Sequence, residues 1–175
     1  MAGCSNQKPT VATTTTITTM PAQTWVNQVC TALEANFNAI NSATDGYKAG
    51  FNSKELLTTA QQNLVSFLNQ VQSAYQSLVT QINSLKPPSV KGGLKAFATI
   101  QMAVKDAYDS VNAAIVLAQN LPIDNVANFH SSASQLSLLL KDALTKTDSI
   151  INQVQNGKTS QVLAVLFSKN QNCPS

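Results

Sequence analysis

The side chains that most often do chemistry in proteins are scarce in this sequence. It holds one histidine, His130, and two glutamates, Glu34 and Glu55, and it has no arginine. A hydrolase would need His130 beside a nucleophile, but the sequence shows no nucleophile-elbow motif, and a histidine alone makes no catalytic constellation. His130 follows an apolar helix position and is expected at a helix flank. We predict that the chain has no catalytic residue and is not an enzyme.

The sequence also has few residues that could bind a metal or a cofactor. A haem held between helices would need an axial pair such as His130 with Met102, yet Met102 lies off the apolar series and no Cys-x-x-Cys-His motif is present. A di-iron site needs a Glu-x-x-His motif, which is also missing. Asp106 and Asp109 fall on one helix face, but Lys105 beside them indicates a solvated patch. We therefore predict no metal and no cofactor.

Charge is sparse along the whole sequence. Only 11% of residues are charged, the net charge is +3, and all 11 basic residues are lysines without a basic run. Without arginine forks or a basic stripe, we predict no binding to nucleic acid. Asn, Gln, Ser and Thr supply the polarity instead, so the solvated faces are mostly neutral. Such a surface would suit a polysaccharide or a protein partner.

The first residues suggest how the chain is attached. Ala2-Gly3-Cys4 matches the end of a bacterial lipobox, in which the signal peptidase cuts before a cysteine that carries diacylglycerol. Met1 is then an added start residue in place of a removed signal peptide. The Thr-rich stretch that follows is uncharged and poor in packing residues, so we predict residues 1–23 as a disordered tether. We expect Cys4 to anchor the protein to the outside of a bacterial cell membrane; the alternative is a chance cysteine near a disordered terminus.

From residue 24 to residue 175 the sequence indicates one helical domain. Apolar residues recur at spacings of three and four, and no window reaches the roughly 18 consecutive apolar residues of a membrane span. The pattern predicts an all-α fold, an antiparallel up-down four-helix bundle with a short C-terminal helix. The expected helices cover residues 24–42, 53–85, 89–121, 124–155 and 160–167.

Several local features define these boundaries. Asp45-Gly46 predicts a loop after a first helix whose apolar stripe includes Phe37. Ser53 and Asp124 are expected to cap the second and fourth long helices. The third helix is expected to place Leu94 in its apolar stripe. The glycines at 92 and 93 in its first turn are expected to mark the close approach of another backbone.

Two further cysteines and the single tryptophan are candidate contact residues. Cys30 lies beside the apolar stripe of the first helix, and Cys173 lies in the polar tail. Export would favour a disulfide between them that fixes the tail to the first helix; the alternative is a buried free thiol and an unrelated tail thiol. Trp25 either covers the end of the bundle or is an exposed contact for a partner.

Three stretches carry a resemblance. "WVNQVCTAL" opens a helix, "LKPPSVKGG" joins two long helices, and "F…NCP" lies near the end of the chain. From Trp25 to Cys173 the chain resembles a group of small helical lipoproteins and secreted proteins of actinobacteria. The resemblance implies an exported helical bundle with a terminal disulfide and no assigned activity. The chain departs from that group in having no arginine and in its Asn-rich polar faces.

Together these features predict an exported, lipid-anchored bundle of the cell envelope that acts as a non-enzymatic interaction or structural module. The expected partner is an envelope protein or a polysaccharide. The alternative is a carrier that binds a lipid, haem or other apolar ligand in its interior. The many alanines at core positions could pack tightly or leave a pocket, and a cavity above roughly 300 Å³ would favour the carrier.

Overall fold

The computed structural model describes residues 17–50, 56–171 and 173 of the chain. Its helices are α1 (Ala22–Gly50), α2 (Leu57–Ser84), α3 (Gly93–Gln119), α4 (Val126–Gln155) and α5 (Gln161–Ser168). Within the described residues the only β-type pairing is an isolated bridge between Met20 and Pro88. The all-α fold predicted from the apolar periodicity is confirmed.

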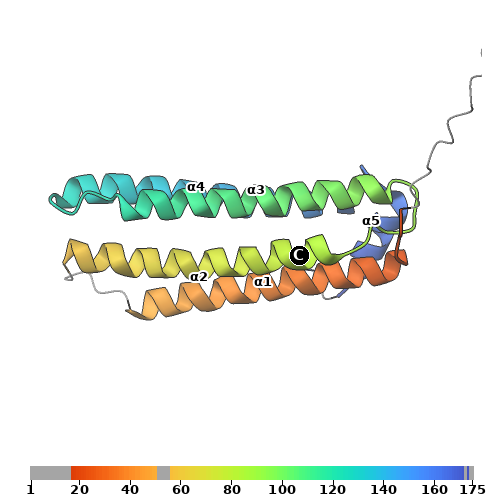
Figure 1. The fold of residues 1–175 in the computed structure, drawn as a ribbon, viewed down its shortest axis with the longest axis horizontal. Coiled ribbons are helices and arrows are strands. Elements are labelled where there is room, and N and C mark those ends of the chain that lie inside the picture. The colour runs from red at the N-terminus through yellow and green to blue at the C-terminus, as the bar shows by residue number, and fades with distance from the viewer. Residues whose placement is uncertain (1–16, 51–55, 172, 174–175) are drawn as a thin grey trace, which may run out of the picture.

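The four long helices lie side by side as a helical bundle (Figure 1). Helix α1 packs against α2, α2 against α3 and α3 against α4, while α5 contacts both α1 and α4. We call the end that holds α5, the α2–α3 connection and the start of α1 the proximal end. The opposite end, where α1 and α3 finish, is the distal end. Met20, near the first described residue of the chain, pairs with Pro88 at the proximal end.

The core is made of aliphatic side chains opposite small ones. Leu68, Leu78 and Ile82 of α2 are fully buried, and each contributes about 1.5–3 kcal/mol relative to an exposed position. Ala107 and Ala114 of α3 are also fully buried. Because alanine adds little volume, these positions let neighbouring helices approach closely. The alanines predicted at core positions of α3 therefore pack into the helix interface.

Helix α1 is longer than the sequence pattern predicted. It continues through Asp45-Gly46 to Gly50, so the loop predicted there is wrong. The physical reason is tertiary packing: Ala43 is buried and the ring of Tyr47 lies 5.0 Å from the ring of Phe67 in α2. These contacts stabilise the helix beyond a glycine that costs only about 1 kcal/mol in a helix interior.

Two apolar residues, Phe37 and Leu94, are exposed, although the sequence pattern placed them in buried stripes. Phe37 is 53% exposed rather than part of the stripe, because Asn36 takes the inward position and is only 7% exposed. Leu94 is 55% exposed, since Gly93 and Ala96 face the crowded interior at the start of α3. The predicted stripes thus had the correct period but were placed about one residue out at these turns.

The starts of α3 and α4 are shifted as well. Helix α3 begins at Gly93 instead of near Ser89, because the Ser89 N–H donates to the Met20 carbonyl at 2.8 Å. Helix α4 is capped by Asn125 and not by Asp124: the Asn125 side chain accepts hydrogen bonds from the N–H groups of Ala127 and Asn128. The predicted cap Ser53 lies outside the described residues. Helix α5 lies one residue further along than predicted.

Candidate functional site

The outer surface of α2 is built from one kind of side chain. Its sequence contains no Asp, Glu, Lys, Arg or His. Every exposed residue of this helix is Ser, Thr, Asn or Gln, because its apolar residues face inward at helical spacing. We call this surface the amide–hydroxyl face; its exposed residues are Thr58, Thr59, Gln62, Ser66, Asn69, Gln70, Ser73, Gln76, Ser77, Thr80, Gln81, Asn83 and Ser84.

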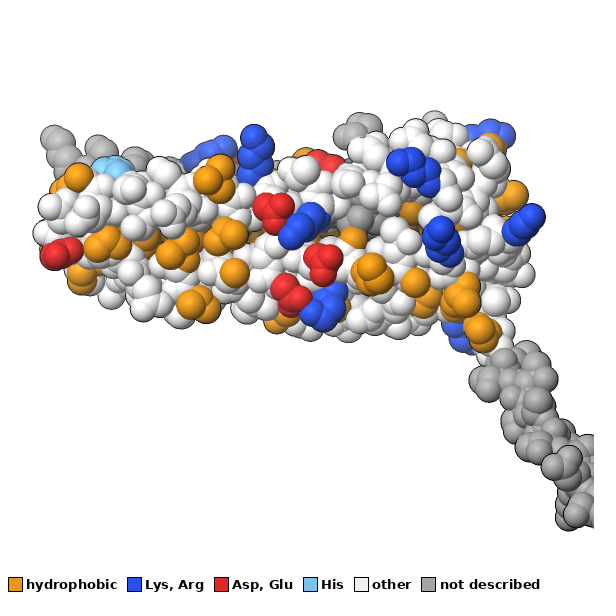
Figure 2. All heavy atoms as spheres, turned by 90° about the horizontal axis from the view of Figure 1, so that it is seen from above, with side chains coloured by type: hydrophobic (Ala, Val, Ile, Leu, Met, Phe, Trp, Pro, Cys, Tyr) orange, Lys and Arg blue, Asp and Glu red, His pale blue; other side chains and the backbone are white. Residues whose placement is uncertain are grey.

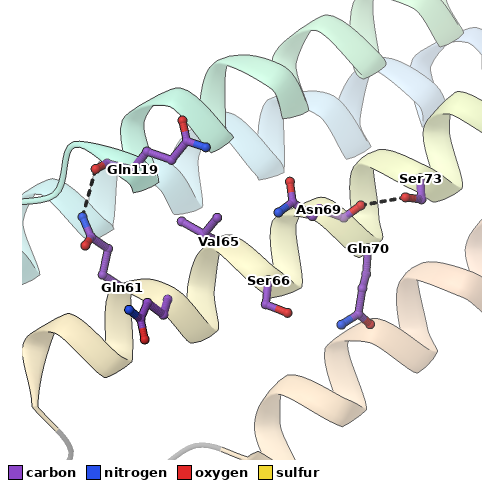
Figure 3. A pocket seen from close by; sticks show the side chains of 8 residues that line it. Gln61, Val65, Ser66, Asn69, Gln70, Ser73 and Gln119 are labelled. Carbon is purple, nitrogen blue, oxygen red and sulfur yellow. Dashed lines mark hydrogen bonds between the residues drawn. The ribbon is translucent and has the colours of Figure 1, made fainter.

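A groove of about 540 Å³ runs along part of this face (Figure 3). Gln61, Asn69, Ser73 and Gln119 are among its lining residues, with Val65 as an apolar element. The Gln61 Nε2 donates to the carbonyl of Gln119 at 3.0 Å, which joins α2 to the end of α3 beside the groove. The groove therefore offers both polar side-chain ends and apolar surface, and a hydrogen bond between helices bounds it at one end.

A second groove of about 450 Å³ continues along the same helix. It shares Ser73 with the first groove and reaches Tyr108 of α3. Gln72 lines it and donates through Nε2 to Asn112 Oδ1 at 2.6 Å, across the contact between α2 and α3. The two grooves thus follow one polar track on α2, with a tyrosine ring beside its second half.

The chemistry of this track is neutral hydrogen bonding. Side-chain amides offer both donors and acceptors, and each hydroxyl offers one donor and acceptor lone pairs. The hydroxyls of Ser73 and Thr80 donate to the carbonyls of Asn69 and Gln76, at 2.9 and 2.8 Å. Their oxygens remain available as acceptors, while the glutamine and asparagine side chains supply donors. This arrangement can exchange hydrogen bonds with a hydroxyl-rich neutral ligand.

The chemically reactive residues of the sequence lie elsewhere and do not converge. His130 is exposed on α4, where its ring contacts that of Phe129 edge-on at 6.2 Å. Met102 is 66% exposed and lies away from the core. Within the part of the chain that the structure describes, His, Cys, Asp and Glu form no group of three able to hold a metal ion.

Helices α3 and α4 each carry an exposed Lys–Asp pair, and Figure 2 shows blue and red side chains side by side on this surface. Lys105 donates to Asp109, and Lys146 Nζ lies 2.7 Å from Asp142 Oδ2. The hydrogen bond and the charge of Asp109 raise the pKa of Lys105 above its ordinary value, and the hydrogen bond to Asp142 raises the pKa of Lys146. Asp109 is half-exposed, as expected of a solvated patch.

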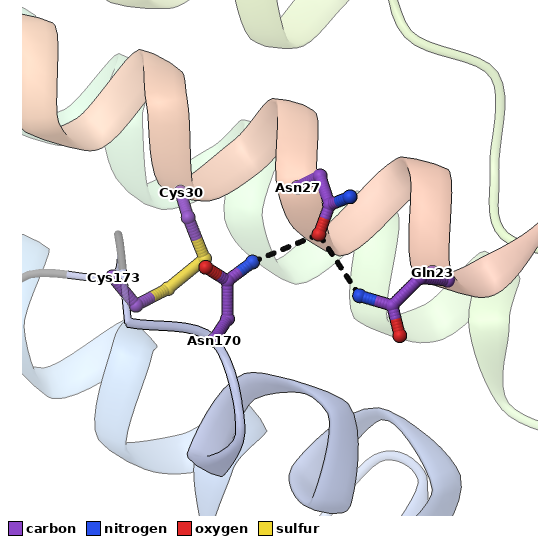
Figure 4. The surroundings of a disulfide bond; sticks show 5 residues. All are labelled: Gln23, Asn27, Cys30, Asn170 and Cys173. Atoms are coloured by element: carbon purple, nitrogen blue, oxygen red, sulfur yellow. Dashed lines mark hydrogen bonds between the residues drawn. A yellow bond between two sulfur atoms is a disulfide. The ribbon is translucent and has the colours of Figure 1, made fainter.

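The predicted disulfide is confirmed: Cys30 and Cys173 are bonded, with their Cα atoms 4.5 Å apart. Figure 4 shows the tail lying along α1 at this point. The Asn170 Nδ2 donates to Asn27 Oδ1 at 3.0 Å, and Gln23 Nε2 donates to the same oxygen at 2.9 Å. The disulfide and these amides fix the C-terminal segment to the first turns of α1.

Trp25 belongs to the core and not to a contact surface. It is 0% exposed, and its ring lies edge-on to Phe167 of α5 with centroids 6.0 Å apart. The interpretation in which Trp25 covers the bundle end is therefore confirmed. The interpretation as an exposed contact for a partner is wrong, because α5 covers the indole.

Cys4 and most of the predicted tether lie outside the described residues, so the lipidation site remains a prediction. None of the described helices combines the length and the apolar character needed to cross a membrane. In comparisons with known proteins, no family model, no curated protein and no solved structure matched the chain. The resemblance to small helical lipoproteins and secreted proteins of actinobacteria likewise stays a prediction.

Sequence reasoning recognised a neutral surface but did not locate it. The signal was present in the sequence as a stretch of 28 residues without a charge, at Leu57–Ser84. It was missed because the composition was considered over the whole chain and not helix by helix. The grooves depend on Gln119 and Tyr108 of α3, and no local pattern indicates which residues of α3 meet α2.

Proposed function

We propose that the chain is an exported, lipid-anchored bundle of the cell envelope that acts as a non-enzymatic binding module for a neutral polysaccharide. The proposed fold is an antiparallel up-down bundle; the contacts of α1 with α2, α2 with α3 and α3 with α4, and of α5 with both α1 and α4, support it. The observation that carries the proposal is the amide–hydroxyl face, with its two adjoining grooves along α2.

A neutral polysaccharide fits this face better than a protein does. Protein interfaces concentrate binding energy in aromatic, Met and Arg side chains at a desolvated centre. The exposed large hydrophobic residues include none within Leu57–Ser84, so the face has no apolar centre of that kind. A polysaccharide, in contrast, presents hydroxyls that exchange hydrogen bonds with amides, and Tyr108 offers an apolar ring with a polar tip beside the second groove.

The location at the envelope rests on the two cysteine features. Cys4 follows Ala-Gly as the lipid-bearing cysteine of a lipobox does. The Cys30–Cys173 disulfide is of the kind that forms in oxidising compartments outside the cytoplasm. Both features support export, and they are independent of each other because they involve different cysteines.

The carrier is the second candidate. The two grooves of about 540 and 450 Å³ are large enough for a small molecule, but they lie on the outer face of α2 and not in the bundle interior, where a carrier would hold its ligand. Their lining residues are also mostly Asn, Gln, Ser and Thr, and burying an apolar ligand against the unpaired polar ends of these side chains costs free energy. The polysaccharide module is therefore the better-supported function.

The proposal is tested by NMR titration of the asparagine and glutamine side-chain amides. The probes are soluble neutral oligosaccharides of glucose, mannose and galactose, with a lipid-like alcohol as the carrier probe. We expect at least one oligosaccharide to shift the side-chain amides of α2 in a saturable way. A response to the alcohol alone, or a response confined to other helices, would contradict the proposal.

A pair of variants with equal charge change sharpens this test. Asn69→Asp places a carboxylate in the first groove, and Asn128→Asp places one on the exposed start of α4. Each substitution keeps the shape of the side chain and replaces its amide donor with a charge. We expect Asn69→Asp to weaken oligosaccharide binding roughly ten-fold, since a donor is lost in the groove, and Asn128→Asp to leave binding unchanged.

A further inference from the structure

The fold gathers lysines that are far apart in the sequence at the proximal end. Lys86 and Lys91 lie in the α2–α3 connection, Lys95 lies in the first turn of α3, Lys158 lies between α4 and α5, and Lys169 follows α5. All five side chains are exposed. Figure 2 shows blue side chains gathered over this end of the bundle. The charge that looked evenly spread in the sequence is therefore concentrated in space.

Backbone contacts hold two of these segments together. A Cβ placed on Gly92 would lie 2.0 Å from the carbonyl oxygen of Thr159, so the α2–α3 and α4–α5 connections touch there. Lys91 and Lys158 each lie one residue from that contact. Their two ammonium groups thus come from adjacent segments, although 67 positions separate them (158 − 91 = 67).

The start of the chain joins the same cluster. The Met20 N–H donates to the Pro87 carbonyl at 3.0 Å, directly beside Lys86. On the other side, Asn170 bonds to Asn27 in the first turns of α1, which places Lys169 at the same end. Met20, close to the first described residue, therefore lies at the same end as these lysines.

Acidic residues are scarce at this end within the described part of the chain: the nearest one in α4, Asp148, lies seven positions before that helix ends (155 − 148 = 7). The ranges 17–33, 75–104 and 149–173, which form the proximal parts of the helices and their connections, contain no Asp or Glu. The distal end is different, because Asp45 and Asp124 accompany Lys48 there. The bundle is therefore electrically polar along its long axis, with its positive end where the predicted tether begins.

We propose that the proximal lysines, Lys86, Lys91, Lys95, Lys158 and Lys169, form a membrane-facing surface that binds anionic lipid headgroups beside the anchor. This inference rests on the proposed function in that Cys4 supplies the anchor. Lysines act as point charges that suit a diffuse anionic surface, and each one near such a surface strengthens binding about five-fold. The attraction acts within about one Debye length, roughly 8 Å at physiological salt.

The tether would strengthen the contact between these lysines and the membrane. From Cys4 to Ile17 the chain spans 13 residues (17 − 4 = 13), a reach of at most about 45 Å at 3.3–3.6 Å per residue. Confinement within that radius makes contact with the membrane intramolecular, at an effective concentration on the order of millimolar. With its proximal end against the lipid, the bundle would extend α2 and its amide–hydroxyl face away from the membrane.

Vesicle sedimentation tests the surface apart from the anchor. The full chain carrying Cys4→Ala cannot be lipidated, and it is mixed with vesicles of phosphatidylcholine alone or with added phosphatidylglycerol. We expect binding only to the anionic vesicles, with loss of binding at high salt. Because Cys4 is absent, failure of this binding would overturn the lysine surface and leave the lipid anchor and the polysaccharide site untouched.

Matched double variants separate position from net charge. Lys86→Gln with Lys91→Gln removes two proximal lysines, and Lys48→Gln with Lys141→Gln removes two exposed lysines elsewhere. We expect the proximal pair to weaken vesicle binding roughly 25-fold, at five-fold for each lysine, and the other pair by no more than about two-fold. Equal losses would overturn the proposal, since net charge alone would then explain binding. Tighter binding to inorganic phosphate or to a soluble anionic polysaccharide than to vesicles would also overturn it.

Discussion

The proximal and distal ends of the bundle are held together in different ways. At the proximal end, segments distant in the sequence meet through the Cys30–Cys173 disulfide and the bridge between Met20 and Pro88. At the distal end, the described contacts include the ring pair of Tyr47 and Phe67. The proximal end thus has a covalent and backbone-level framework, whereas the described distal contacts each involve a side chain, either a ring or the Gln61 amide that donates to the Gln119 carbonyl. This difference suits a molecule that is attached at one end and meets its ligand along its length.

The largest effect that tests this comparison is removal of the disulfide. Cys173→Ser opens a loop with a sequence separation of 143 while leaving the buried Cys30 side chain in place. We expect a loss of about 3–5 kcal/mol of unfolding free energy on the chain-entropy account, measured by chemical denaturation. Under reducing conditions the variant and the natural chain should unfold alike; a difference that persists there would contradict the account.

The sequence predicted this covalent link but not what surrounds it. Export favoured the pairing of Cys30 with Cys173, and the polar tail offered few other ways to be held. The aromatic contact of Trp25 with Phe167 depends on how α5 docks, which no local pattern records. The pairing of two cysteines is predictable from sequence because a disulfide joins only cysteines, whereas the way in which α5 docks depends on the whole fold.

The next largest expected effect on the unfolding free energy comes from substituting two glycines, Gly92 at the proximal end and Gly46 at the distal end. Gly92 has φ +80°, and a Cβ there would lie 2.0 Å from the Thr159 carbonyl oxygen; a Cβ on Gly46 would meet nothing within 4 Å. We expect Gly92→Ala to lower the unfolding free energy by about 3 kcal/mol. Gly46→Ala should raise it by about 0.5–1 kcal/mol, since alanine favours a helix. Equal shifts in these two variants would show that the ends are not built differently.

These glycines also show where sequence reasoning succeeds and fails. The pair Gly92-Gly93 correctly indicated close backbone approach, because glycine is the residue that permits it. Asp45-Gly46 was interpreted by the same logic as a turn, but α1 continues through it. The packing of Tyr47 on Phe67 outweighs the local preference, and that contact joins residues 20 positions apart (67 − 47 = 20).

The proximal lysines show that the sequence also does not reveal which charged residues the fold brings together. In the sequence they form no basic run, because they are separated by up to 83 positions (169 − 86 = 83). Only the alternating direction of the helices brings Lys86, Lys158 and Lys169 to one end. The uncharged face of α2 lies within one helix, so its composition was readable from the sequence, whereas its grooves were not.

The smallest expected effect on stability concerns the exposed pair of Lys105 and Asp109, which lies between the two ends of the bundle. Because the folded-state pKa of Lys105 is raised above its ordinary value of 10.5, the pair stabilises the fold below that pH and loses its contribution as pH rises through the raised pKa. We expect Asp109→Asn to return the lysine pKa toward its ordinary value in an NMR titration. Near neutral pH the change in Tm should be slight. A fall in Tm as large as that of Cys173→Ser would refute this ranking.

The most direct test of the account is the chemical state of Cys4 in the cell. The chain is exported in a bacterial host behind a lipoprotein signal peptide, and the Cys4 peptide is analysed by mass spectrometry alongside fractionation of the cells. We predict a diacylglyceryl mass increase on that peptide and protein in the membrane fraction, both lost in Cys4→Ala. An unmodified Cys4 with the protein in the soluble fraction would contradict the anchored module.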